Sequence, residues 1–347
     1  MEQPPGFKDP IFPNHVCLLK KALYGLKQAP KAWFHKFSSY LLHLGFFCSK
    51  ADSSLFVLHS SKGILLLLLY VDDIILTGNS SILLSELIVT LKSRFAMKDM
   101  GDLHYFLGIE VRRSSGGLFL SQNKYATDIL ERTQMMGARA LHTPLSQKHT
   151  LHESTGATGD ASTYRSVVGA LQYLTLTRPE ISHAVNRLCQ FMHQPTDTHW
   201  SGVKRVLRYI AGTKQLGLRI SAQSSLNFAG FSDADWVGCP LTRRSTTGLC
   251  VFLGSNCISW SSKKQNTVAK SSAEVEYRSL VSLAMELTWI TYVLKDIGLP
   301  LSRPPILFTD NISALHLTTN PVLHARTKHV ELDYHFVREK VVQGAIW

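Results

Sequence analysis

The stretch Ile64-Leu65-Leu66-Leu67-Leu68-Leu69-Tyr70-Val71-Asp72-Asp73-Ile74-Ile75-Leu76-Thr77 decides the fold of the first third of the chain. Two adjacent aspartates interrupt an otherwise apolar run, which predicts two strands joined by a tight turn. A plain β-hairpin is one interpretation, because Asp is a good turn former. The other interpretation is a metal site, because neighbouring carboxylates repel each other unless they share a cation such as Mg²⁺.

Apolar periodicity extends this pattern in both directions. We expect one helix after Pro30 and another over residues 83–95, with Asn79 or Ser80 as its cap. Further strands are expected over residues 55–58, 103–111 and 117–121. Residues 143–163 are rich in Ser, Thr, Gly and His and predict a linker. Helices should follow over residues 164–176, 180–193 and 199–211.

The last third has a different order of elements, namely three strands, a long helix, a strand and a helix. The expected ranges are 226–233, 248–254, 257–261, 272–297, 306–309 and 311–318. Strands and helices are therefore both abundant but segregated, which predicts a mixed α/β chain of the α+β kind. Its 347 residues are enough for two or three domains.

Charge and composition narrow the class of protein. The chain has 37 Lys and Arg against 25 Asp and Glu, a net charge of +12, and 45% hydrophobic residues. It should therefore be globular and should favour a polyanionic partner, nucleic acid before a membrane surface. The six cysteines form no Cys-x-x-Cys pair, which favours a reducing compartment. The longest apolar run is too short for a membrane span, and the first residues do not resemble a signal peptide.

Four motifs resemble one known family. Tyr70-Val71-Asp72-Asp73 resembles the Tyr-x-Asp-Asp box of reverse transcriptases, and Leu23-Tyr24-Gly25-Leu26-Lys27-Gln28-Ala29-Pro30-Lys31-Ala32-Trp33 resembles a helix of copia-type LTR retrotransposon Pol polyproteins. Gln-Pro-Pro-Gly-Phe at residues 3–7 and Tyr-Phe-Leu-Gly-Ile at residues 105–109 are also similar to that family. The resemblance implies a partial polymerase palm and thumb, a helical connection and a mixed-sheet domain like ribonuclease H.

The resemblance also implies roles for residues of the first acidic site. Asp72 and Asp73 would be catalytic metal ligands, and Gln28 would lie near the template and the incoming nucleotide. Tyr70, Lys27 and Lys31 would contact nucleotide or nucleic acid. Lys20, Lys21, Lys27 and Lys31 also suit phosphate contacts on physical grounds, although a solvated basic surface is an equal alternative for any one lysine.

A second set of carboxylates occurs in the last third, in an order that resembles ribonuclease H. Asp233 and Asp235 have the same strand parity. The resemblance favours Asp233 as the metal ligand, and Asp235 is expected to be a turn or strand-end residue. Glu276 continues an apolar helical stripe and should face the sheet, whereas Glu274 should serve the first helical turn. Asp310 alone would suit a helix N-cap, but together with Asp233 and Glu276, in this order on these elements, it is interpreted as the third, catalytic metal ligand.

Basic residues near this second site are candidates for phosphate contacts. Lys263 and Lys264 are the main ones, and ordinary solubility is the alternative explanation. The same interpretation applies to Arg243, Arg244 and Lys270, and to Lys204, Arg205 and Arg208 beside Tyr209. Thr327, Lys328, His329, Glu331 and Asp333 are interpreted mainly as surface residues, on a helix whose core face is Val330, Tyr334 and Val337.

The domain prediction follows from these motifs. Residues 1–142 would be a partial reverse transcriptase, residues 143–225 a linker and helical connection, and residues 226–347 a domain like ribonuclease H. The family has a further catalytic aspartate before residue 3 and another after residue 347, so we expect a chain truncated at both ends, with one carboxylate missing from each site. Enzymatic activity of the chain alone is therefore left open.

The resemblance implies RNA-directed DNA synthesis and hydrolysis of RNA in an RNA–DNA hybrid, with two Mg²⁺ or Mn²⁺ ions per site. The partners would be an RNA template, the RNA–DNA hybrid and dNTPs, without a membrane, in an intracellular setting, cytoplasmic or nuclear. Two alternatives are weighed against this function. One is an inactive retroelement remnant that at most binds nucleic acid, and the other is an unrelated Mg²⁺-dependent nuclease.

Overall fold

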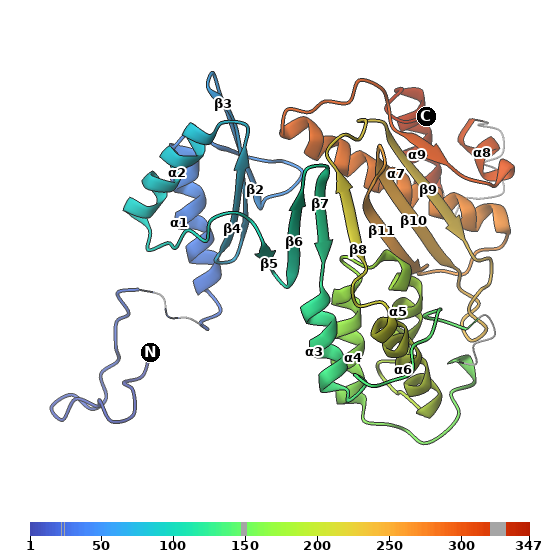
Figure 1. Cartoon of the computed structure of the whole chain (residues 1–347), viewed down its shortest axis with the longest axis horizontal. Coiled ribbons are helices and arrows are strands. Elements are labelled where there is room, and N and C mark those ends of the chain that lie inside the picture. The colour runs from blue at the N-terminus through green and yellow to red at the C-terminus, as the bar shows by residue number, and fades with distance from the viewer. Residues whose placement is uncertain (22, 24, 147–150, 320–330) are drawn as a thin grey trace. The chain divides into compact units, whose positions relative to one another are not determined.

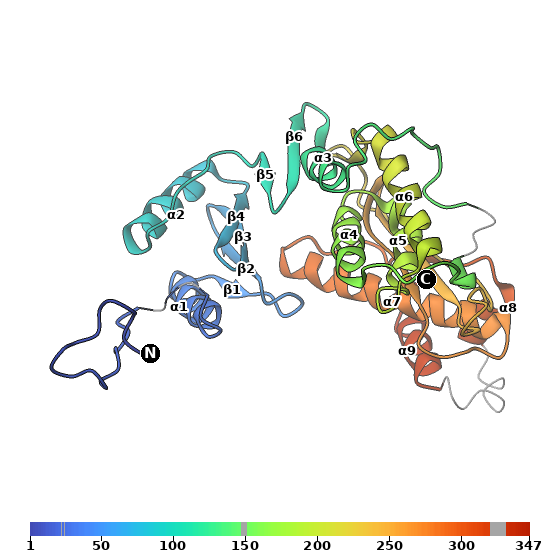
Figure 2. The same cartoon turned by 90° about the horizontal axis from the view of Figure 1, so that it is seen from below.

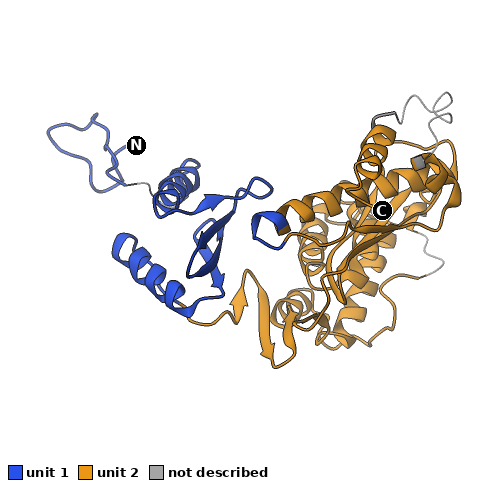
Figure 3. Ribbon diagram, turned by 90° about the horizontal axis from the view of Figure 1, so that it is seen from above, with its two compact units in different colours: residues 1–99, 295–299 blue, residues 100–294, 300–347 orange. Residues whose placement is uncertain are grey.

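A computed structural model describes the chain except for residues 22, 24, 147–150 and 320–330. The chain divides into two compact units, one with residues 1–99 and 295–299 and the other with residues 100–294 and 300–347 (Figure 3). These two units are defined by contacts between residues, whereas the predicted domains are defined by function. The domain bounds therefore stay a prediction. Each unit is described by itself.

Unit 1 is a four-stranded sheet with two helices (Figure 1). The antiparallel sheet has the order β1-β2-β3-β4, and its strands are β1 (Phe47–Cys48), β2 (Leu55–Ser60), β3 (Gly63–Tyr70) and β4 (Asp73–Gly78). The helices are α1 (Ala29–His43) and α2 (Ser81–Arg94). Alternate residues of β3 are buried in one core with both helices, so α1 and α2 cover the same face of the sheet.

The sequence predicted these elements of unit 1 well. Pro30 lies in the first turn of α1, and Ser80 caps α2 by accepting a hydrogen bond from the Leu83 N–H. The two-residue strand β1 was not predicted, because so short a strand has no periodicity of its own.

Unit 2 begins with an antiparallel sheet of order β5-β6-β7-β8. Its strands are β5 (Tyr105–Phe106), β6 (Ile109–Ser114), β7 (Gly117–Ser121) and β8 (Gly217–Ser221). The single strand expected over residues 103–111 was wrong. Leu107 and Gly108 both have positive φ angles, so the chain reverses there and forms two strands instead of one. β8 was not predicted.

A helical core follows in unit 2. Its elements are α3 (Asn123–Arg132), the 3₁₀ turn η1 (Leu151–Glu153), α4 (Ala161–Leu174), the 3₁₀ turn η2 (Pro179–Ile181), α5 (Ser182–Cys189) and α6 (Asp197–Gly212). The three predicted helical segments correspond to α4, η2 with α5, and α6. The predicted linker is not wholly without structure, because Leu151 is buried in this core.

The last part of unit 2 is a mixed sheet of order β11-β10-β9-β12. Its elements are β9 (Phe228–Ala234), β10 (Thr246–Leu253), β11 (Asn256–Lys264), α7 (Ser272–Asp296), β12 (Ile306–Phe308), α8 (Ile312–Thr319) and α9 (Glu331–Val342). Each predicted strand and helix of this region is confirmed. β12 runs parallel to β9, and the other neighbours are antiparallel.

Helices lie on both faces of this mixed sheet (Figures 1 and 2). Ser259 of β11 donates to Glu286 of α7, whereas the next residue, Trp260, donates its indole N–H to the Thr175 carbonyl at the end of α4. Successive strand residues point to opposite faces. α7 therefore covers one face, and the helical core packs on the other along β11. None of the helices in the described part of the chain combines the length and apolar character that a bilayer crossing requires.

Candidate metal centre

The parallel pairing of β12 with β9 brings two carboxylates to one edge of the mixed sheet. Phe308 pairs with Phe231, and the aspartates follow two residues later on each chain segment, as Asp310 and Asp233. Side chains two residues apart point to the same face of a strand, so these carboxylates lie next to each other. Residues that are distant in the sequence therefore become neighbours through strand register alone.

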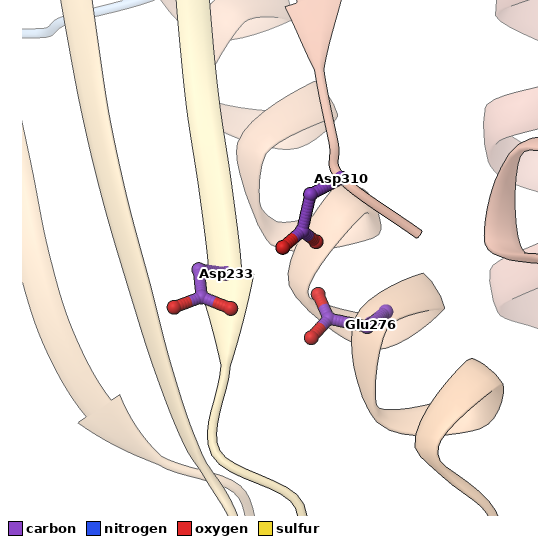
Figure 4. A group of neighbouring side chains, drawn as sticks. All are labelled: Asp233, Glu276 and Asp310. Carbon is purple, nitrogen blue, oxygen red and sulfur yellow. The ribbon is translucent and has the colours of Figure 1, made fainter. Parts of the chain in front are cut away.

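The second turn of α7 brings the third carboxylate, Glu276. Ligand oxygens of Asp233, Glu276 and Asp310 all lie within 4.8 Å of one another (Figure 4). Figure 4 shows the three side chains converging from β9, from α7 and from the end of β12. Within the described residues, this is the one group of three or more His, Cys, Asp or Glu side chains close enough to hold a metal ion.

Close packing of α7 on β9 fixes the position of Glu276. Gly230 makes the approach possible, because a Cβ atom there would lie 2.4 Å from a Leu283 methyl carbon. Ser279 then donates to the Asp233 carbonyl at 2.9 Å, and the Ala234 N–H donates to Glu276 Oε1 at 3.3 Å. Glu276 therefore faces the sheet, as the apolar stripe of the helix predicted.

The surroundings of Glu276 disfavour its charged form. Burial raises the pKa of Glu276 to about 7, and the negative charge of Asp233 adds to this, while the Ala234 N–H opposes it and Asp310 adds a further increase. Its buried Oε2 atom has no donor among the described residues. A proton on Glu276 can be shared with Asp233, which also raises the pKa. None of the described cationic side chains forms an ion pair with this carboxylate.

A divalent cation fits this group of side chains. The ligands are all carboxylate oxygens, which Mg²⁺ and Mn²⁺ prefer, and a cation would supply the missing partner of the buried Glu276 oxygen. Asp233 and Asp310 are exposed, so the site is open to solvent on their side. Glu276 is only 7% exposed and forms the inner wall.

Glu274 has a separate role, as its position on another face of α7 predicted. It forms an ion pair with Arg278 at 2.7 Å and accepts a hydrogen bond from the Lys270 N–H. Unlike Glu276 it is therefore a buried carboxylate with a cationic partner. Asp235 lies just past β9 and accepts a hydrogen bond from the Thr246 N–H, which confirms the expected turn position.

Asp310 is not the cap of α8, so the alternative to its predicted role as a metal ligand does not hold. The cap is the next residue, Asn311, whose Oδ1 accepts a hydrogen bond from the Ala314 N–H at 2.9 Å. A capping side chain normally binds the N–H two or three residues ahead, and α8 begins at Ile312. Asn311 therefore takes the capping role, and the Asp310 carboxylate can point to Asp233 and Glu276.

The first acidic site has a simpler geometry. Asp72 and Asp73 are exposed in the turn between β3 and β4, where Tyr70 pairs with Asp73. Val71 in this turn has a φ of 53°, and its carbonyl accepts a hydrogen bond from the Trp33 indole at 2.6 Å. No third His, Cys, Asp or Glu in the described part of the chain completes a metal group there. The hairpin is confirmed, and the metal role stays a prediction.

The predicted nucleotide-contacting residues of unit 1 are all exposed. Lys27 and Gln28 directly precede α1, and Lys31 lies in its first turn. Tyr70 ends β3 and is 55% exposed. The Trp33 hydrogen bond joins the first half of α1 to the Asp72–Asp73 turn. Tyr24 of the motif before α1 lies outside the described residues.

The two predicted lysines of β11 differ. Lys263 is exposed. Lys264 donates to Gln190 Oε1 at 2.8 Å and to Cys239 Sγ at 2.9 Å, so its charge is used within the chain. Although burial raises the pKa of Cys239, hydrogen bonds from Lys264 and Thr242 bring it down to about 7. The sequence did not point to this pairing, because its two residues lie on separate segments.

The helix α9 agrees only in part with its prediction. Tyr334 and Val337 are buried, which confirms the core face. Asp333 is half-buried and was wrongly interpreted as a surface residue. Burial raises the pKa of Asp333, while the nearby Arg278 opposes the shift. Thr327, Lys328, His329, Val330 and the side chain of Glu331 lie outside the described part of the structure.

A cavity of about 410 Å³ opens beside Asp233. It lies between α5 and the face of the mixed sheet that α7 does not cover. His183 of α5 lines it, with Nδ1 3.3 Å from the Ser262 hydroxyl. Thr246 and Ser182 also line it, and their hydroxyl oxygens are buried without a partner. Sequence reasoning missed these residues. Ser182 and His183 come from the helical region, and no local pattern marks them.

Comparisons with known proteins place the chain in a family. Residues 1–147 match the family described as reverse transcriptase (RNA-dependent DNA polymerase). The chain is 50% identical over 348 residues to the retrovirus-related Pol polyprotein from transposon RE2 of Arabidopsis thaliana, covering 100% of this chain and 24% of that protein. It is 37% identical over 352 residues to the one from transposon TNT 1-94 of Nicotiana tabacum, covering 98% and 26%.

A shorter relative is covered almost in full. The putative transposon Ty5-1 protein of Saccharomyces cerevisiae is 31% identical over 291 residues, which are 83% of this chain and 94% of that protein. The chain spans about a quarter of the length of the Pol polyproteins that it matches.

Proposed function

Since the chain belongs to the copia-type retrotransposon Pol polyproteins, in their reverse transcriptase portion, we propose that it carries two divalent-metal sites for nucleic-acid chemistry. Reverse transcriptases as a family use divalent metals and nucleic-acid templates. Under this proposal the carboxylates of unit 2 hydrolyse the RNA strand of an RNA–DNA hybrid. The Asp72–Asp73 turn of unit 1 belongs to RNA-directed DNA synthesis.

The convergence of Asp233, Glu276 and Asp310 carries the proposal for unit 2. Three elements place their oxygens within 4.8 Å, and within the described part of the chain the inner carboxylate has no cationic partner. A purely structural arrangement would pair or neutralise such charges, as the Glu274–Arg278 ion pair does in the same helix. An arrangement that leaves them unpaired favours a site that binds cations, for which Mg²⁺ or Mn²⁺ is proposed.

The three side chains would have different roles in such a site. Asp233 and Asp310 hold their carboxylates at the solvent-exposed edge, where a phosphodiester can approach. Glu276 holds its carboxylate from the buried side and loses its proton around neutral pH. A bound divalent metal would supply charge for the attacking water and for the leaving oxygen. The cavity lined by His183 adjoins Asp233 and offers room for the sugar-phosphate chain.

The proposal for unit 1 rests on less geometry. Asp72 and Asp73 are exposed at a hairpin turn that α1 contacts through Trp33. We assign them to metal binding, Gln28 and Tyr70 to the template and the incoming dNTP, and Lys27 and Lys31 to phosphates. An intracellular setting, cytoplasmic or nuclear, is part of the same proposal.

The test is cleavage of a labelled RNA–DNA hybrid by the purified chain with Mg²⁺ or Mn²⁺. We expect RNA fragments from the wild type, no cleavage by Asp233→Asn, and cleavage by the matched control Asp72→Asn. Failure of the folded wild type to cleave with either metal would sink the nuclease proposal. Binding that weakens with salt, without cleavage, would then identify a remnant that only binds nucleic acid.

A further inference from the structure

A second cavity in unit 2 lies among the helices rather than at the acidic site. Its volume is about 590 Å³, and α6 forms one wall of it. None of its lining residues lines the cavity beside Asp233. The basic residues that line it are Lys204, Arg205 and Arg208.

Helical geometry explains why these cations share one wall. Val203, Val206 and Ile210 are buried in the helical core. Residues three or four apart lie on the same face of a helix, so Arg208 lies beside both Lys204 and Arg205 on the opposite side. The basic face is therefore what remains of α6 once its apolar face is packed.

Hydrogen bonds hold the arginines at this cavity. Arg208 Nε donates to the Arg139 carbonyl at 2.7 Å, and an Arg205 terminal nitrogen donates to the Thr143 hydroxyl at 2.7 Å. Arg205 Nε is buried, and none of the described residues accepts a hydrogen bond from it. A buried guanidinium nitrogen that lacks an acceptor is costly, and an anion in the cavity would supply one.

The described residues that line this cavity carry no negative charge. No Asp or Glu lines it, and none of the three cations forms an ion pair within the described part of the chain. Four apolar side chains lie on the other side, from Met135, Leu141, Leu145 and Leu151. An apolar wall reduces screening by water, so it strengthens the attraction of the three cations for an anion.

The wall that carries Leu151 is anchored to α6. His199 is buried in α6, and its Nδ1 accepts a hydrogen bond from the Thr196 N–H at 2.8 Å. The ring therefore has its proton on Nε2, which donates to the Leu151 carbonyl at 2.9 Å. This hydrogen bond holds η1 against α6, so the cavity has two fixed sides.

We propose that this cavity binds a backbone phosphate of nucleic acid through Lys204, Arg205 and Arg208. Guanidinium groups match phosphate oxygens in a bidentate way, and an ammonium group adds charge without strict geometry. The apolar wall suits the sugar that adjoins a phosphate. The net charge of +12 agrees with a polyanionic partner. The proposal concerns binding and does not depend on cleavage at the acidic site.

The experiment measures binding of a labelled RNA–DNA hybrid to the full chain, in EDTA, over a series of salt concentrations. EDTA prevents metal-dependent cleavage, so the result is independent of the nuclease proposal. Lys204→Gln and Arg208→Gln should each lower the slope of log affinity against log salt by about 1. The double variant should lower it by about 2 and weaken binding roughly tenfold or more.

Two controls separate phosphate contact from structural damage. Arg208→Lys keeps the charge but loses the Nε bond to Arg139, and it should keep the wild-type slope. Arg219→Gln removes an exposed charge of β8 that does not line the cavity, and it should also keep the slope. Wild-type slopes for folded Lys204→Gln and Arg208→Gln would overturn the proposal.

Thermal unfolding with inorganic phosphate distinguishes the two possible anions, a phosphate of nucleic acid and free phosphate. We expect no saturable thermal stabilisation of the wild type by phosphate beyond that by chloride at equal ionic strength. Stabilisation that disappears in Arg208→Gln, together with unchanged hybrid binding by that variant, would identify a site for free phosphate. That result would also overturn the assignment to nucleic acid.

Discussion

The two acidic sites of this chain are built in opposite ways. Asp72 and Asp73 are neighbours in the sequence, and one exposed hairpin turn presents both of them. Asp233, Glu276 and Asp310 come from a strand, a helix and a strand end, and only tertiary packing brings them together. The turn leaves its carboxylates in water, whereas the fold concentrates charge and buries part of it. A metal should therefore contribute far more at the second site than at the first.

Metal binding gives the largest expected contrast. Asp233→Asn should lower the affinity of the chain for Mn²⁺ by more than about 100-fold, because even residues that only orient a ligand typically contribute 10- to 100-fold. Asp72→Asn should leave this tightest site unchanged. Isothermal titration with Mn²⁺ measures both. Equal losses for the two variants would show that the sites are not different in kind.

The pH dependence of stability is the next largest effect. The pKa of Glu276 rises from about 4.5 to about 7 on folding, so the folded state binds its proton more tightly. This contribution to stability is complete below about pH 4.5 and is lost as the pH rises through 7. Glu276→Gln does not titrate. Without metal it should therefore gain stability over the wild type as the pH rises, to on the order of 2 kcal/mol at about pH 8.

Glu274→Gln is the matched control on the same helix. Glu274 is buried and paired with Arg278 at 2.7 Å, so removing its charge leaves a partly buried guanidinium without its partner. The variant should lose about 2 kcal/mol at neutral pH, the opposite sign from Glu276→Gln. Urea unfolding in EDTA at several pH values measures both. A loss of stability in Glu276→Gln would contradict the electrostatic account of the second site.

Much of the second site could be predicted from the sequence, because its parts follow local rules. The apolar stripe of α7 that includes Leu280 and Leu287 determines which glutamate faces the sheet. Strand parity determines the side of Asp233. No local sequence pattern predicts that β12 pairs with β9. That expectation came only from the resemblance to the order of elements in ribonuclease H. The sequence therefore predicts on which face of a helix or strand a residue lies, whereas the contacts between those faces depend on the tertiary structure.

The errors have two origins, one local and one tertiary. The chain reverses at Leu107 because of a backbone conformation that its apolar neighbours conceal. β8 is only five residues long, so it has little periodicity of its own. The helical core separates it in the sequence from β7, the strand with which it pairs. The pairing of Lys264 with Cys239 depends on a loop conformation. The pairing of β8 and the contact of Lys264 therefore depend on geometry beyond one strand, whereas the reversal at Leu107 is a local backbone conformation.

Substitution of Asn311 tests whether its capping of α8 leaves the Asp310 carboxylate free to bind metal. Asn311→Ala removes the hydrogen bond to the Ala314 N–H and should cost about 1 kcal/mol of stability. It should also weaken Mn²⁺ binding, because Asp310 can then turn to cap α8. Asn311→Asp restores a capping side chain and should restore most of both. Urea unfolding and Mn²⁺ titration measure the two effects. Unchanged metal binding by Asn311→Ala would show that capping and ligation are independent.

The smallest expected effect concerns the first site. Val71 has a φ of 53°, a conformation that costs a residue with a Cβ atom about 1–2 kcal/mol. Val71→Gly removes this strain but gives the unfolded chain more freedom, which offsets roughly half of the gain. The variant should therefore be more stable by about 0.5 kcal/mol. Urea unfolding against Val89→Gly, which should destabilise the middle of α2, would measure it. A loss in Val71→Gly would mean that packing, rather than the turn itself, holds Asp72 and Asp73 in place, and the contrast between a local and a tertiary site would then disappear.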